Sequence, residues 1–72
     1  MDIQYAKDLI VRDMVVFLMT EEGKTLKEAL GIIYNSVLYE KLSDSETGLY
    51  FQSSDYNYEL LQNELKTGKL MP

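Results

Sequence analysis

Met14 to Met19 are six apolar residues in a row, within a stretch over residues 2–22 that has no proline or glycine. Apolar residues recur there at intervals of three and four, which places them on one helical face. They are Ile3, Ala6, Ile10, Met14 and Phe17. The pattern predicts a helix over residues 3–22, and because the run adds apolar groups outside that face, we expect burial on most of its circumference. A membrane span needs roughly 18 apolar residues, so we expect no membrane association.

A second row of residues, roughly opposite the first, leaves two interpretations of this helix open. The row comprises Leu9, Arg12, Val16 and Met19. In the first interpretation the helix is central, and other helices cover it on several sides. In the second, Leu9, Val16 and Met19 form an exposed patch that a second chain covers. The Val-Val-Phe sequence also suits a buried strand, but the helical spacing before it argues against one.

Capping residues divide the rest of the chain into three further helices. Thr25 followed by Glu28 forms a capping box, which marks the start of the second helix. Ser36 and Ser54 are good N-cap residues for the third and fourth helices. The four predicted helices span residues 3–22, 26–35, 37–43 and 55–67.

Residues 43–48 are rich in turn formers, and we expect residues 49–51 after them to be a short extended segment. The predicted fold is all-α, a single domain over residues 1–72 that forms a compact bundle of about four helices. A chain this short buries only about 60% of its unfolded surface, so its stability is marginal unless it pairs. The predicted core residues are Ile10, Met14, Phe17, Leu30, Ile33, Leu38, Leu61 and Leu65.

The chain contains no cysteine and no histidine. Disulfides and the usual zinc ligands are therefore missing, as are the commonest general base and the best nucleophile. Asp44 and Glu46 have a spacing that acid–base or calcium chemistry could use, but their Ser- and Gly-containing turn favours backbone hydrogen bonding. We expect no catalytic activity, no cofactor and no metal site. The lack of cysteine also fits a reducing compartment, so we expect a cytoplasmic location.

The net charge is −5, and residues 35–65, with six acids and one base, account for the whole deficit. Such a surface repels nucleic-acid phosphates and suits a basic partner, and it also keeps a small protein soluble. The second and third predicted helices could form a helix-turn-helix, so a DNA-binding regulator is the alternative function. The third helix, however, offers one acid, one base and no Arg, Asn or Gln for base edges. We therefore expect no nucleic-acid partner.

Five of the six tyrosines fall within residues 34–58. Tyrosine is enriched in binding surfaces, and it also fills the rim of small cores, so both interpretations stay open. The candidate partner-binding residues are Leu9, Arg12, Val16, Met19, Tyr39, Tyr50 and Tyr56. We expect the partner to be another protein or a second copy of the chain in a homodimer.

Three segments carry a resemblance to a known family: Tyr34-Asn35-Ser36, Tyr39-Glu40-Lys41-Leu42 and Glu46-Thr47-Gly48-Leu49-Tyr50. The chain resembles, over nearly its whole length, short bacterial proteins grouped as a domain of unknown function, many from gut anaerobes. That family has no assigned activity. Some relatives are encoded near ADP-ribosyltransferase-like proteins, which implies an accessory or antitoxin-like binding role. We therefore predict a small protein-binding module without catalytic activity of its own.

Overall fold

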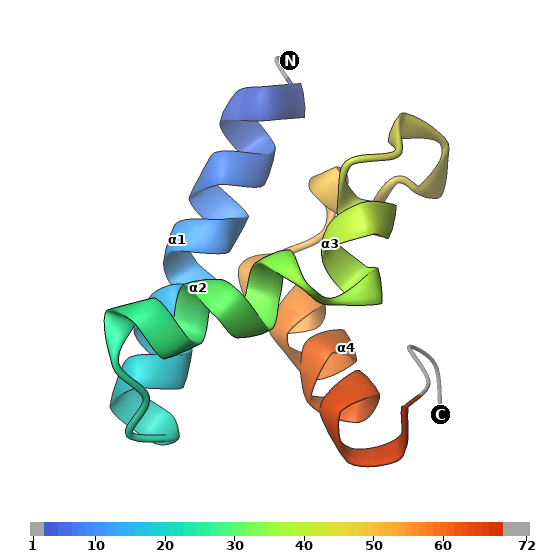
Figure 1. Cartoon of the computed structure of the whole chain (residues 1–72). Coiled ribbons are helices and arrows are strands. Elements are labelled where there is room, and N and C mark those ends of the chain that lie inside the picture. The colour runs from blue at the N-terminus through green and yellow to red at the C-terminus, as the bar shows by residue number, and fades with distance from the viewer. Residues whose placement is uncertain (1–2, 69–72) are drawn as a thin grey trace.

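A computed structural model describes residues 3–68 of the chain, and this part is helical almost throughout (Figure 1). The four α-helices are α1 (Ile3–Glu21), α2 (Leu26–Tyr34), α3 (Val37–Leu42) and α4 (Ser54–Thr67). Two short 3₁₀ turns, η1 (Ser45–Thr47) and η2 (Leu49–Phe51), connect α3 to α4. Within residues 3–68 there is no strand. The predicted all-α fold is therefore confirmed, and each helix begins and ends within one residue of its predicted bounds.

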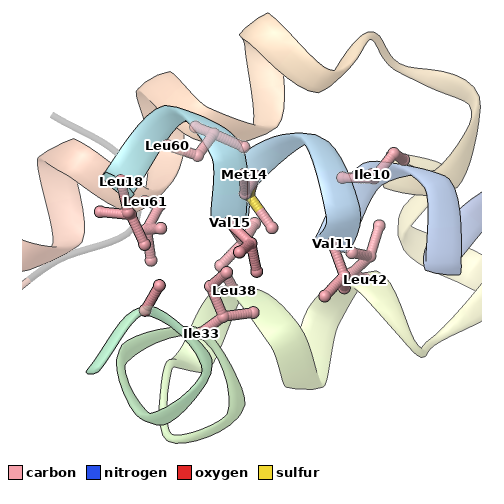
Figure 2. Packing of buried hydrophobic residues seen from close by; sticks show 11 residues of the cluster. Ile10, Val11, Met14, Val15, Leu18, Ile33, Leu38, Leu42, Leu60 and Leu61 are labelled. Atoms are coloured by element: carbon pink, nitrogen blue, oxygen red, sulfur yellow. The ribbon is translucent and has the colours of Figure 1, made fainter. Parts of the chain in front are cut away.

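The longest helix, α1, is the element against which the others pack. It contacts α2, α4 and η2, while α3 packs against α4 and α2 (Figure 1). The core lies between these helices, and α1 supplies five of its side chains (Figure 2). The buried cluster comprises Ile10, Val11, Met14, Val15, Leu18, Ala29, Ile33, Leu38, Leu42, Leu60 and Leu61. Burial nevertheless does not extend around most of α1 as predicted, because Val16 is 49% exposed and Met19 40% exposed.

Five of the eight predicted core residues are buried: Ile10, Met14, Ile33, Leu38 and Leu61. Phe17 and Leu30 are only partly buried. Leu65 is 50% exposed, so its assignment to the core was wrong. The inner face of α4 instead carries Asn57, Leu60 and Leu61. A polar Asn57 on this face hides the apolar pattern from the sequence.

The caps explain where most helices begin. The Thr25–Glu28 capping box is present on α2, and the Ser36 side chain accepts from the Tyr39 amide on α3. The predicted cap of α4 is displaced by one residue, because Ser53 rather than Ser54 accepts from the Tyr56 amide. The Ser54 hydroxyl is thereby free to donate to the Asp13 carboxylate on α1, over 2.6 Å.

Residues 49–51 form the 3₁₀ turn η2, so the predicted extended segment is wrong. Gly48 has a φ of 69°, a left-handed conformation that glycine adopts without strain, and it turns the chain back on itself. The Phe51 amide then donates to the Gly48 carbonyl, and the Gln52 amide to the Leu49 carbonyl, each over 3.0 Å. The Asn57 side chain fixes this turn to α4 by donating to the Leu49 carbonyl over 3.1 Å.

Glu64 caps α3 from a distance of 26 residues in the sequence. Its carboxylate accepts from the Val37 amide over 2.8 Å and from the Leu38 amide over 3.0 Å. Amides in the first turn of a helix lack intrahelical partners, and a carboxylate there also interacts favourably with the helix dipole. This contact stabilises a helix of only six residues, which is too short to be stable on its own.

The core assignment predicts how two truncations on α1 should differ. Met14 is completely buried, so Met14→Ala should lower the free energy of unfolding by about 2–5 kcal/mol. Phe17→Ala should cost less, because the Phe17 side chain keeps part of its exposure in the folded state. Urea denaturation of both variants checks this order, and a larger loss for Phe17→Ala would place the core elsewhere.

Removing the distal cap should cost stability although it leaves the apolar core intact. Glu64→Ala should lower the free energy of unfolding by about 1–3 kcal/mol, because two helix amides lose a charged acceptor. Glu59→Ala is a matched control on the same helix, since Glu59 is exposed and should cost no more than about 0.5 kcal/mol. Equal losses for the two variants in urea denaturation would contradict a capping role for Glu64.

Candidate functional site

The outward side of α1 carries a row of incompletely buried side chains, which we call the α1 strip: Tyr5, Leu9, Arg12, Val16 and Met19. The exposed fraction is 63% for Tyr5, 49% for Val16 and 40% for Met19. Leu9 is partly buried, and the Arg12 side chain is 67% exposed. Large apolar side chains on one helical row thus face away from the core, which is the pattern expected of a surface that contacts another molecule.

An open groove of about 380 Å³ lies between α1 and α2, on one side of the strip. We call it the α1–α2 groove; it is lined by Asp8, Val11, Arg12, Val15, Val16, Leu26, Leu30 and Tyr34. Val11 and Val15 belong to the core and form its base. Its walls are exposed apolar groups, because Leu26 is 54% and Tyr34 53% accessible. Asp8 and Arg12 are the charged residues of this lining.

A second hollow, of about 290 Å³, lies on the other side of the strip, between α1 and the segment from Tyr50 to Ser54. Leu9 and Tyr50 both line it, so η2 lies beside the N-terminal half of the strip. Arg12 borders both hollows. The second hollow is more polar, because Asp13, Gln52, Ser53 and Ser54 also line it.

The seven candidate residues from the sequence do not gather in one place. Val16 lines the α1–α2 groove, whereas Leu9 and Tyr50 line the second hollow. Tyr39 contacts Tyr34 edge-on, with ring centroids 5.0 Å apart, and the Lys7 ammonium lies 5.2 Å from its ring centroid. Tyr56, on α4, is 42% exposed.

Sequence reasoning missed the wall that α2 contributes. Leu26, Leu30 and Tyr34 line the groove, and their four-residue spacing is visible in the sequence. Leu26 and Leu30 look like core residues by pattern, because the sequence does not show where α2 crosses α1. The crossing leaves Leu26 exposed and buries Ala29 and Ile33 instead.

Polar contacts around Asp13 fix the strip in place. Arg12 and Asp13 form an ion pair at 3.0 Å, although neighbours in sequence cannot tie two helices together. The Ser54 hydroxyl does connect helices, since it joins α4 to Asp13 of α1. Hydrogen bonds from Ser54 and then from Arg12 lower the pKa of Asp13 below its usual value of 3.8.

The ring of Tyr58 packs against that of Phe17, with the ring centroids 5.0 Å apart. Burial raises the pKa of Tyr58, and the nearby charges of Glu21 and Glu22 raise it further.

Three further features of residues 3–68 bear on metal, membrane and DNA binding. This part of the chain holds no group of three or more acidic side chains that could bind a metal ion. None of its helices has the length and apolar character that crossing a membrane requires. On α3, the helix expected to read DNA in the alternative function, the exposed side chains are Val37, Glu40 and Lys41.

Comparison of the chain with protein-family models, with curated proteins and with solved structures found no match in any of the three. The resemblance to bacterial proteins of unknown function therefore stays a prediction.

The lowered pKa of Asp13 makes a prediction about acid stability. A carboxyl group with a lowered pKa in the folded state stabilises the fold above its unfolded pKa, and this contribution disappears as the pH falls through the folded pKa. Stability should therefore decline from about pH 4 downwards, in part because Asp13 is protonated. In Asp13→Asn the decline should be shallower when unfolding is followed from pH 5 to pH 2. Asp8→Asn is the control, because Asp8 accepts its hydrogen bond from Gln4 within α1.

Proposed function

We propose that this chain is a protein-binding module that has no catalytic activity of its own and binds its partner through the α1–α2 groove and the adjoining α1 strip. The proposal rests on the exposure of apolar side chains in the groove walls. Val16, Leu26 and Tyr34 each keep about half of their surface exposed around a hollow of about 380 Å³. A partner that covered these side chains would gain about 25 cal/mol for each Å² of apolar surface removed from water.

The composition of the groove supports a protein partner over other classes. Apolar walls with a few placed charges are typical of the centre of protein interfaces, where charged residues are depleted and aromatic residues enriched. In the groove, one acid and one base, Asp8 and Arg12, lie one helical turn apart. A nucleic-acid site would instead need a cluster of positive charge, and the chain carries −5 overall. An accessory or antitoxin-like role remains what the family resemblance implies.

Affinity capture with matched leucine variants tests the proposal. The tagged chain should capture a protein from a lysate of its source organism, and a captured untagged copy of the chain counts among the possible partners. Leu26→Gln should weaken capture by about tenfold, because an amide buried without a hydrogen-bond partner costs about 1–3 kcal/mol. Leu65→Gln is the control, since Leu65 is 50% exposed and Leu26 54%, and Leu65 lies on α4 away from the groove. No specific capture, or equal loss in both variants, would contradict the proposal.

A further inference from the structure

The residues of the α1 strip follow one another at intervals of four, three, four and three. Two strip positions therefore occur in every seven residues, which is about two helical turns. This is the spacing of the contact row when one helix packs along another. The five side chains lie on α1 and avoid its core face, where Met14 and Leu18 are almost fully buried. A row with this spacing runs nearly along the helix axis, so a second helix laid along α1 can contact the whole of it.

The strip and the groove lie side by side, and they share Arg12 and Val16. A surface that presents a ridge next to a groove can be its own complement, because a twofold rotation places the ridge of each copy in the groove of the other. We propose that the occupant of the α1–α2 groove is a second copy of this chain, whose α1 packs antiparallel across the first. This inference rests on the proposed binding function and names its partner.

Two antiparallel registers pair four of the five strip residues with one another, and we choose the one that uses both Val16 and Met19 and leaves out Tyr5. A twofold axis close to Met14 places Leu9 of one copy opposite Met19 of the second copy. The same axis places Arg12 opposite Val16 of the second copy. The Cα position of Arg12 then lies about 4.5 Å, measured along the helix axis, from that of Asp13 of the second copy, given a rise of about 1.5 Å per residue. Arg12 can therefore exchange its partner within the chain for the same carboxylate of the other copy.

The charge distribution favours contact on this face over contact through α3, η1, η2 and α4. Residues 35–65, which hold six acids and one base, belong mostly to α3, η1, η2 and α4. Two copies that met through those elements would bring like charges together. The strip and its groove carry only Asp8 and Arg12. Pairing through α1 therefore leaves the acidic surfaces of the two copies apart, where water and salt screen them.

The size of this surface sets the expected affinity. The strip and the groove together comprise eleven residues, whereas a standard interface uses about 20–30 residues and about 800 Å² on each side. The chain exposes 4673 Å² in total, so a standard interface would require about a sixth of it. We expect a contact smaller than standard and a dissociation constant on the order of 10 µM rather than in the nanomolar range.

Sedimentation equilibrium of the intact chain and two variants tests the pairing. The parent should be largely dimeric at a few hundred micromolar and dissociate on dilution to about 1 µM. Val16→Glu should weaken the dimer at least about tenfold, because it would bury a carboxylate without a partner. Leu65→Glu, a substitution at a side chain of equal exposure on α4, should leave dimerisation unchanged. A strictly monomeric parent at these concentrations, or equal loss in both variants, would overturn the inference.

A cross-linking experiment tests the register and does not depend on a charge substitution. The chain has no cysteine, so Leu9→Cys and Met19→Cys each introduce a single thiol. On oxidation, an equal mixture of the two variants should form a disulfide dimer between unlike chains. Each variant alone should form none, because like positions would lie about 15 Å apart along the helix, beyond the reach of a disulfide. Cross-linking of each variant with itself, or none in the mixture, would refute the antiparallel pairing.

The two proposals fail in different ways. If the chain is monomeric while the tagged chain still captures a different protein through the groove, only the second-copy inference is wrong. If neither a second copy nor another protein binds, the proposed function is wrong as well. If the parent dimerises and the Leu9→Cys and Met19→Cys chains cross-link in the mixture, both stand.

Discussion

The fold depends on the burial of one broad face of α1. Five of its side chains, from Ile10 to Leu18, belong to the same buried cluster as residues from the other three α-helices (Figure 2). None of those helices is longer than 14 residues, and short helices gain their stability from tertiary packing more than from propensity. The shorter helices therefore depend on packing with α1, and removing the buried side chains of α1 should unfold the whole domain.

Polar contacts between elements complete what apolar packing begins. Glu64 caps α3, Asn57 holds η2 against α4, and Ser54 connects α4 to Asp13 of α1. Each satisfies groups that would otherwise lose hydrogen bonds to water in a small domain with little apolar core. These three side chains also fix the distance between α4 and its neighbours, and with it the shape of the hollow beside the N-terminal half of the strip.

Local signals predicted the helices well, and the same signals predicted only part of the interior. A capping box such as that of Thr25 and Glu28 depends on residues only three positions apart, so the sequence shows it directly. The exposure of Leu65 and the burial of Asn57 depend on how α4 packs against the other helices, and local signals in the sequence do not show that packing. The groove shows the same limit. Tyr34 was not among the predicted contact residues, and only the crossing of α2 over α1 makes Tyr34 and Leu26 walls of that groove.

The helix α1 has two sides with different roles: an inner face that holds the fold, and an outer strip through which we propose that the chain binds a second copy. Amide chemical shifts in ¹⁵N-labelled protein, followed by NMR from about 10 µM to about 1 mM, test both sides at once. If two copies pair through α1, amide chemical shifts should change with concentration at strip residues such as Val16 and along the groove wall from Leu26 to Tyr34. Amides on the outer side of α4, Glu59 among them, should stay constant. Concentration-dependent shifts confined to α3 and α4, or none anywhere, would contradict binding through the outer side of α1.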